Sequence, residues 1–152
     1  MDSIQPITTR NEECLYRLLN IWELSVRHTH LFLSEQDIDV LRPLVIQGME
    51  HINHLLAFID DHDQSLGFIG IQDNKIEMLF VEPAAMGKGI GKSLVAYAIQ
   101  ILNVVYVDVN EQNPQALGFY ERMGFQVFER SALDEQGNPF PILHMKLSIG
   151  SR

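Results

Sequence analysis

Apolar and polar positions alternate along the chain in a way that predicts short strands and amphipathic helices. Short apolar runs between polar turns are typical of strands, and apolar residues spaced three and four apart are typical of helices. The expected strands are residues 4–7, 55–60, 66–71, 76–81, 104–109, 125–131 and 141–147. The expected helices cover about 11–27, a segment that starts at 34, 92–102, and a segment from 113 to 124.

Several of these helices begin with recognisable capping residues. The capping residues are Asn11, Ser34 with its partner Asp37, and Asn113 followed by Pro114. Pro43 lies inside the second helical pattern, where proline either kinks the helix or begins a new turn. Gly124 is expected to end the last helix. These local signals define the helix boundaries independently of the apolar pattern.

The segment 76–109 predicts a strand-helix-strand unit. Two strands joined by such a crossover run parallel, and the crossover is right-handed. A strand-rich first half followed by this unit predicts an α/β protein with a mixed sheet and helices on both faces. The 152 residues fit one domain, which we expect to span 1–152.

A glycine-rich turn, Gly87-Lys88-Gly89-Ile90-Gly91-Lys92-Ser93, joins the strand to its helix. Glycines let the backbone approach a ligand closely, and unpaired N–H groups at a helix N-terminus favour an anion. The turn therefore predicts a pyrophosphate site for a nucleotide-like cofactor. The spacing of Gly87, Gly89 and Gly91 does not fit a dinucleotide fingerprint, and Met86 stands where a P-loop needs its first glycine.

The turn resembles the acetyl-CoA loop of the GNAT (GCN5-related N-acetyltransferase) superfamily, Q/R-x-x-G-x-G/A. Gly89 and Gly91 occupy its two small positions, and Met86 replaces the usual Gln or Arg. That replacement removes a polar side chain but keeps the backbone donors. The neighbouring helix-strand segment resembles the family pattern N-x-x-A-x-x-F-Y-x-x-x-G-F, through Asn113, Ala116, Phe119, Tyr120, Gly124 and Phe125. Residues 22–33 and 130–141 are similar to the YjaB-type branch of small bacterial members.

The resemblance implies a GNAT-like fold, with a central, mostly antiparallel mixed sheet and a splayed parallel strand pair that admits the pantetheine arm. It also implies an N-acetyltransferase that moves the acetyl group of acetyl-CoA to a primary amine by direct attack in a ternary complex. The alternative is a CoA-binding regulatory protein or pseudoenzyme. The implied cofactor-binding residues are Leu79, Phe80, Val81, Met86, Gly87, Lys88, Gly89, Ile90, Gly91, Lys92, Ser93, Asn113, Ala116, Phe119 and Tyr120.

Acyl transfer to an amine needs a proton acceptor, a donor for the oxyanion and a proton for the departing thiolate. Tyr120 is the candidate acid, because a phenol is protonated at neutral pH, and the family tyrosine at this position commonly has that role. Its alternative role is core packing beside Phe119. Glu77 is the candidate base in the strand 76–81, where alternation places it on the face of Val81. A structural ion pair is its alternative role.

The segment between the first two helices carries the candidate substrate-binding residues His28, His30 and Phe32. Trp22 is added from the first helix, and Asn110 from the strand end. His30 is a second candidate for the base. His28 and His30 lack an evident third ligand, so we expect no metal site. Asn113 either contacts the cofactor arm, caps its helix, or does both.

The formal net charge of −9 disfavours nucleic acid as a partner and suits a cationic amine. The acceptor is left open between a small-molecule amine and an amine of a protein or peptide. No apolar run is long enough to span a bilayer, and the N-terminal residues do not resemble a signal peptide. With a single cysteine, Cys14, the composition leads us to expect a cytoplasmic protein. The family resemblance leaves the oligomeric state open between a monomer and a homodimer.

Overall fold

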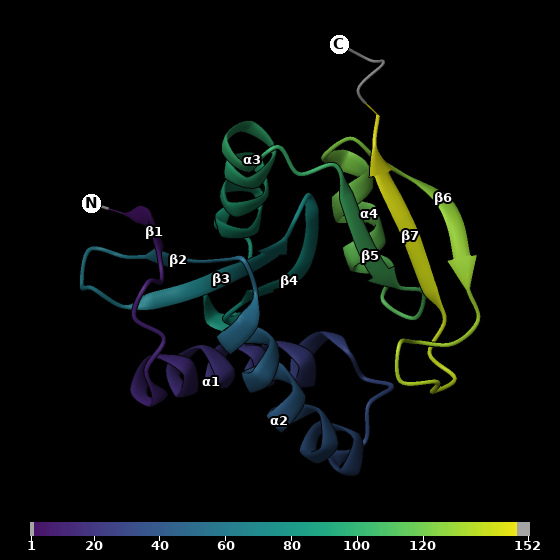
Figure 1. Ribbon diagram of the computed structural model, residues 1–152, viewed down its shortest axis with the longest axis horizontal. Helices are drawn as coiled ribbons and strands as arrows, with labels where there is room; N and C mark the ends of the chain where they lie inside the picture. Colours follow the sequence, from purple (N-terminus) through teal and green to yellow (C-terminus); the bar gives the residue numbers. More distant parts are fainter. Residues whose placement is uncertain (1, 149–152) are drawn as a thin grey trace.

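A computed structural model of the chain describes residues 2–148 and centres on a seven-stranded sheet (Figure 1). The strands are β1 (Ser3–Pro6), β2 (His54–Ile59), β3 (Ser65–Gln72), β4 (Lys75–Val81), β5 (Tyr106–Asn110), β6 (Phe125–Ser131) and β7 (Ile142–Leu147). The helices are α1 (Glu12–Thr29), α2 (Glu35–His51), α3 (Ile90–Leu102) and α4 (Pro114–Arg122), with a short 3-10 turn, η1, at Pro83–Ala85. The expected elements are therefore all present, with shifts of one to a few residues at their ends.

The sheet is mixed, with the strand order β1-β2-β3-β4-β5-β7-β6. Its neighbouring strands are antiparallel except for β4 and β5, which are parallel. These two strands pair only where Lys75 and Ile76 face Tyr106 and Val107. Beyond that point they run apart, as Figure 1 shows between the teal and the green strand. The predicted parallel pair and its implied splay are thus confirmed.

A β-bulge interrupts β4 near its start, at Glu77. Gly70 of β3 faces Met78, and its neighbour Ile71 faces Ile76, so Glu77 has no partner residue on β3. After the bulge, Leu79 and Val81 pack toward one face of the sheet, and Met78 and Phe80 toward the other. Bulges redirect a side chain and occur often beside functional sites.

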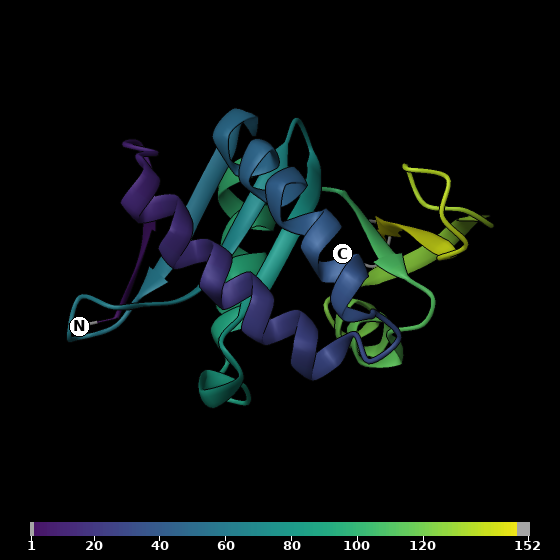
Figure 2. The same cartoon turned by 90° about the horizontal axis from the view of Figure 1, so that it is seen from below.

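Helices cover both faces of the sheet. Figures 1 and 2 show α3 on one face of the β2–β4 part and α1 with α2 on the opposite face. One buried core lies beneath α3 and α4, where Leu94, Val95 and Ala98 meet Ile69 and Ile71. A second core lies beneath α1 and α2, and it includes Leu18, Trp22, Ile38, Met49 and Phe68. Successive side chains of β3 thus point alternately into the two cores, as strand geometry requires.

The helices begin where their capping residues predict. Asn11 accepts a hydrogen bond from the Cys14 N–H at 2.9 Å. Ser34 and Asp37 form the expected reciprocal capping box at 3.1 and 2.9 Å. α2 continues through the exposed Pro43 as far as His51, so this proline does not end the helix.

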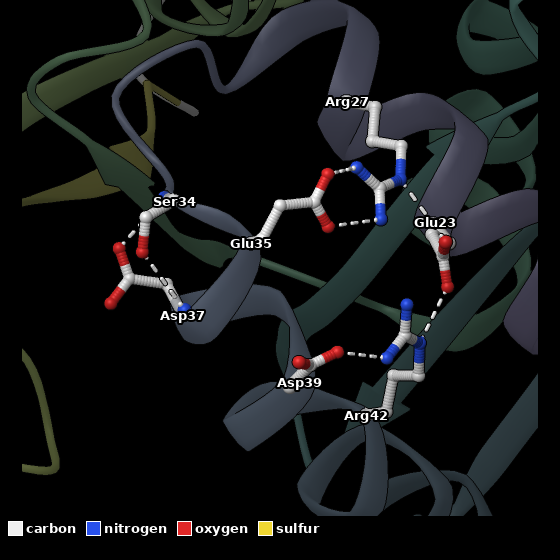
Figure 3. A network of polar contacts seen from close by, with 7 residues as sticks. All are labelled: Glu23, Arg27, Ser34, Glu35, Asp37, Asp39 and Arg42. Carbon is white, nitrogen blue, oxygen red and sulfur yellow. Dashed lines mark hydrogen bonds and ion pairs between the residues drawn. The ribbon is translucent and has the colours of Figure 1, made fainter.

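Ion pairs join α1 to α2 on the outer surface, as Figure 3 shows. Arg27 binds Glu23 at 3.1 Å and Glu35 at 2.6 and 2.8 Å. Arg42 binds the other oxygen of Glu23 at 2.6 Å and also contacts Asp39. The hydrogen bond from Arg42, with help from Arg27, lowers the pKa of Glu23. This network therefore links the two helices on either side of the turn that carries His30.

Candidate active site

The glycine-rich turn presents unpaired backbone donors at the start of α3. Gly87 and Gly89 have left-handed φ angles of 82° and 81°, which side chains other than glycine adopt with strain. Gly89 precedes the first helical residue, Ile90. In the part of the chain that the structure describes, the N–H groups of residues 87–92 meet no acceptor. Such donors, together with the helix dipole, favour an anion, which is the kind of ligand that the sequence predicts for this turn.

The glycine turn borders a cavity of about 580 Å³, called here the glycine-turn cavity. Its lining includes most of the cofactor-binding residues expected from the sequence, namely Leu79, Phe80, Val81, Met86, Gly87, Gly89, Ile90, Gly91, Lys92, Asn113, Ala116, Phe119 and Tyr120. The exposed Lys88 and Ser93 lie outside the lining. The cavity is also lined by three residues at the end of α1, namely Ser25, Thr29 and His30. The splay between β4 and β5 and the start of α3 therefore open onto one space.

Tyr120 is buried at this cavity, with 6% of its surface exposed. Its ring makes edge contacts with Phe119 at 5.0 Å and Phe125 at 5.7 Å between centroids. Burial raises the pKa of the phenol, so it stays protonated at neutral pH. Among the described residues, no buried side-chain oxygen or nitrogen lacks a partner. Because no protein group bonds the Tyr120 hydroxyl, that hydroxyl opens to the cavity. Tyr120 thus has the packing role considered for it, and its protonated hydroxyl also faces the cavity.

The backbone of β4 directs a donor into the splay. The N–H of Glu82 donates to the Leu66 carbonyl on β3 at 2.9 Å. Because N–H directions alternate along a strand, the Phe80 N–H also points to β3, and the Val81 N–H points to the opposite edge. That edge faces the region where β5 has diverged. Of these two backbone donors, the Val81 N–H is therefore the one directed into the splay, where an oxyanion would need a donor.

His30 lies at the junction of two cavities. It lines the glycine-turn cavity and a second space of about 350 Å³, called here the aromatic cavity. The Thr29 hydroxyl donates to the Ser25 carbonyl at 2.9 Å, so its oxygen accepts the hydrogen bond from His30 Nδ1 at 2.8 Å. This assignment leaves His30 Nε2 as an acceptor. Burial lowers the pKa of His30 to about 4, which keeps the ring neutral at neutral pH.

The aromatic cavity collects most of the predicted substrate-binding residues. Trp22, His30, Phe32 and Asn110 line it. Phe140, from the loop between β6 and β7, joins them with its ring 5.5 Å from that of Phe32. His28 does not belong to this group, because α1 extends to Thr29 and leaves His28 exposed on the helix, outside the cavity linings. The expected aromatic wall is present without His28.

Glu77 lines a third cavity, of about 890 Å³, whose carboxylates are Glu77, Asp108, Asp134 and Glu135. We call it the acidic cavity. It shares Asp134 and Ile142 with the aromatic cavity, which in turn shares His30 and Phe80 with the glycine-turn cavity. Glu77 and Val81 thus line different cavities. The expectation that they share a face was wrong, because the bulge at Glu77 breaks the alternation.

A chain of polar contacts crosses the floor of the acidic cavity. Lys75 Nζ lies 2.6 Å from Asp108 Oδ2 and 3.4 Å from Glu77 Oε1. Asp108 Oδ1 accepts a hydrogen bond from His144 Nδ1 at 2.7 Å, and His144 Nε2 lies 2.7 Å from the Ser131 hydroxyl. Burial raises the pKa of Glu77, although the charge of Lys75 opposes it. The ion pair considered as an alternative role for Glu77 exists, but it is long.

Sequence reasoning missed Lys75, Asp108, His144 and Ser131. The signal for two of them was present, because Asp108 and His144 are polar residues inside apolar strands. They face each other directly across β5 and β7. Asn113, in contrast, has its expected place: it caps α4 by accepting the Ala116 N–H at 3.2 Å, and it also lines the glycine-turn cavity. Within residues 2–148, no three metal-binding side chains gather into a site.

Comparison with known proteins gives a consistent result. A model of the acetyltransferase (GNAT) domain matches residues 35–149. The peptidyl-lysine N-acetyltransferase YjaB of Salmonella typhimurium is 39% identical over 129 residues, which cover 85% of this chain and 88% of that protein. YjaB of Escherichia coli is 37% identical over 128 residues, which cover 84% of this chain and 86% of that protein.

Solved structures resemble the whole fold. The solution structure of apo-form YjaB from Escherichia coli superposes with a TM-score of 0.87 at 34% identity, and the match covers 97% of this chain and 98% of that one. The PaiA N-acetyltransferase of Thermoplasma acidophilum, solved in complex with coenzyme A, has a TM-score of 0.70 at 22% identity, again over 97% and 98% of the two chains. At 22% identity, the match to the second structure shows a shared fold and nothing more.

Proposed function

The chain belongs to the GNAT family of acetyltransferases, and from that premise we propose that it transfers the acetyl group of acetyl-CoA to the side-chain amine of lysine in a protein or peptide. The observation that carries the proposal is the opening between β4 and β5, bordered by the glycine turn and by Tyr120. The relatives named as peptidyl-lysine N-acetyltransferases support this choice of acceptor. So does the acidic cavity, since a lysine arrives as a cation.

The residues present fit acetyl-CoA as the donor. The free N–H groups of residues 87–92 suit the pyrophosphate, and Lys92 adds positive charge at the same cavity. The apolar walls formed by Leu79, Val81 and Phe119 suit an extended aliphatic arm in the splay. When bound, acetyl-CoA supplies an activated acetyl thioester. Direct attack by the amine in a ternary complex then requires no covalent bond to the enzyme.

Three groups of the protein would act in the transfer. The Val81 N–H stabilises the negative charge that develops on the carbonyl oxygen. The Tyr120 hydroxyl donates a proton to the departing sulfur, which its protonated state and its opening to the cavity allow. Glu77 accepts the proton of the amine, directly or through water, because burial makes its carboxylate a stronger base than an exposed one.

His30 is the second candidate for the proton acceptor. Its Nε2 is available to accept, and its ring lines both the glycine-turn cavity proposed for the donor and the aromatic cavity. With its pKa lowered to about 4, however, the ring holds a proton weakly at neutral pH. We therefore assign His30 to the orientation of the neutral amine and Glu77 to removal of the proton.

A transfer assay tests the proposal. Purified protein is incubated with acetyl-CoA and lysine-containing peptides, and the assay follows free thiol and the mass of the peptide. We expect one acetyl group on the lysine side chain, and no reaction with the same peptides when that amine is blocked. Binding of acetyl-CoA without transfer to any peptide or small amine would instead favour the regulatory alternative. Transfer confined to small amines would replace the proposed acceptor class.

A further inference from the structure

Two carboxylates compete for one ammonium group in the acidic cavity. Among residues 2–148, Lys75 is the only lysine or arginine that lines this cavity. Its Nζ lies 2.6 Å from Asp108 but 3.4 Å from Glu77. The shorter distance is a full hydrogen bond, and the longer one is a weak contact. Lys75 is therefore bound mainly to Asp108 of β5 and more weakly to Glu77 of its own strand, β4.

Asp108 is held in place from the other side. His144, its direct partner across β5 and β7, donates to Asp108 Oδ1 at 2.7 Å, and Ser131 holds the second ring nitrogen of His144 at the same distance. Both oxygens of Asp108 thus have a partner, one from Lys75 and one from His144. A carboxylate bonded at both oxygens has a fixed orientation, which is the usual purpose of such supporting contacts.

We propose that Asp108 is a positioning residue: by holding the ammonium of Lys75, it keeps that ammonium away from Glu77 and leaves the Glu77 carboxylate available to accept the proton of the acceptor amine. This inference rests on the proposed function of Glu77 as the base. Asp108 itself takes no proton from the substrate and acts through Lys75.

The charges that face Glu77 agree with this arrangement. They come from Lys75 on the same strand, Asp108 on β5 and Glu135 in the loop after β6, and the cavity is also lined by His51, Asp134 and His144. Burial raises the pKa of Glu77; Lys75 opposes this, and Glu135 and Asp108 reinforce it. Burial acts to lower the pKa of Lys75, but the hydrogen bond to Asp108 and the charge of Glu77 outweigh it, so the pKa is raised.

The test is the pH dependence of kcat/KM for acetylation of a lysine peptide. In Asp108→Asn the ammonium is released to Glu77, so we expect the acidic limb of the profile to move about one unit toward lower pH. We also expect kcat to fall while KM for the peptide is unchanged. Asp108→Glu keeps the charge and should keep the limb near its original position. Asp63→Asn, an exposed change in the β2–β3 turn, is the matched control.

A double-mutant cycle shows whether Asp108 acts through Lys75. If it does, the shift caused by Asp108→Asn becomes much smaller in a Lys75→Met background. An equal shift in both backgrounds, or a rise in peptide KM without a shift, would overturn the inference. Should Asp108→Asn fail to fold, His144→Gln loosens Asp108 instead and must move the limb in the same direction by a smaller amount. No movement there would equally overturn it.

The proposed base role of Glu77 and the positioning role of Asp108 can be disproved separately. If Glu77→Gln keeps the wild-type rate, Glu77 is not the base, and the role of Asp108 falls with it. If Glu77→Gln loses activity but Asp108→Asn keeps the wild-type profile, only the positioning role is wrong. Binding of coenzyme A at the glycine turn reports folding in every variant.

Discussion

The side chain of Asn113 accepts a hydrogen bond from the Ala116 N–H at 3.2 Å, and this contact begins the helix that carries Tyr120. The same side chain borders the glycine-turn cavity. One residue therefore has a structural role that the geometry defines and a ligand-binding role that we propose. The two roles can be measured apart.

Replacing the cap tests both roles of Asn113. Asn113→Ala should lower the free energy of unfolding by about 1 kcal/mol, because an N-terminal N–H of α4 loses its acceptor. Asn113→Ser keeps a capping oxygen and should retain most of the stability. Both variants should bind coenzyme A more weakly, as measured by calorimetry. Wild-type affinity in Asn113→Ser would restrict Asn113 to capping.

The anion site predicts a strong effect of a charge at Gly89. Gly89→Glu should abolish binding of coenzyme A, because a carboxylate would enter the region of free N–H groups at the start of α3. The control is Gly137→Glu, since Gly137 has the same φ of 81° and equally open surroundings in the β6–β7 loop. Both variants carry similar backbone strain, of about 1–2 kcal/mol. Loss of binding in both, or in neither, would contradict the placement of the site.

The hydroxyl of Tyr120 is expected to matter for rate and little for folding. Tyr120→Phe keeps the ring contacts with Phe119 and Phe125, so unfolding should stay close to wild type. Loss of the acid should lower kcat by about 10²-fold or more, with coenzyme A affinity retained. Tyr97→Phe, on α3, is the matched control. A Tyr120→Phe enzyme with the full wild-type rate would remove the acid role.

Because burial lowers the pKa of His30, we expect the protein to lose stability on mild acidification. The pKa of His30 is lowered to about 4 in the folded state, against about 6.5 in the unfolded chain, so the unfolded state binds the extra proton between these values. The free energy of unfolding should therefore fall as the pH drops from about 6.5 to about 4, by no more than about 3 kcal/mol. His30→Gln should remove this part of the dependence, measured by urea unfolding at several pH values.

His28→Gln is the control for that experiment, because His28 is an exposed residue on the same helix. It removes an imidazole from the same helix but from outside the cavity linings. The carboxylates paired with arginine, such as Glu23 and Glu35, have lowered pKa values in the folded state. Their contribution is present above the unfolded pKa and is lost only at lower pH. A wild-type dependence in His30→Gln would show that other groups cause the change between about pH 6.5 and about pH 4.

The sequence predicted well those features that depend on neighbours along the chain. Helix caps at Asn11, Ser34 and Asn113 involve residues three positions apart, and the free donors at Gly89 follow from a helix start. The parallel pair followed from one strand-helix-strand unit. Each of these inferences needed no knowledge of how distant segments meet, and the structure confirms the elements they define.

The features that sequence reasoning missed depend on strand register. Asp108 and His144 are 36 positions apart, and they meet only because β7 lies between β5 and β6 in the sheet. The bulge at Glu77 is a property of the β3–β4 pairing, which local alternation does not reveal. His28 was misplaced for a simpler reason: α1 is two residues longer than its apolar stripe predicted, so His28 remains on the outer helix surface.

The short pairing of β4 with β5 gives the molecule an internal sheet edge. Past Ile76, the side of β4 that faces away from β3 has the free peptide groups of an edge strand, yet it lies in the middle of the sheet and between α3 and α4. Edge strands usually invite pairing with other chains and need protection. In the proposed function this gap receives the narrow, amide-containing arm of acetyl-CoA, which would take the place of the missing neighbour. The same feature that interrupts the sheet would thus select ligands by their width and their peptide-like hydrogen bonding.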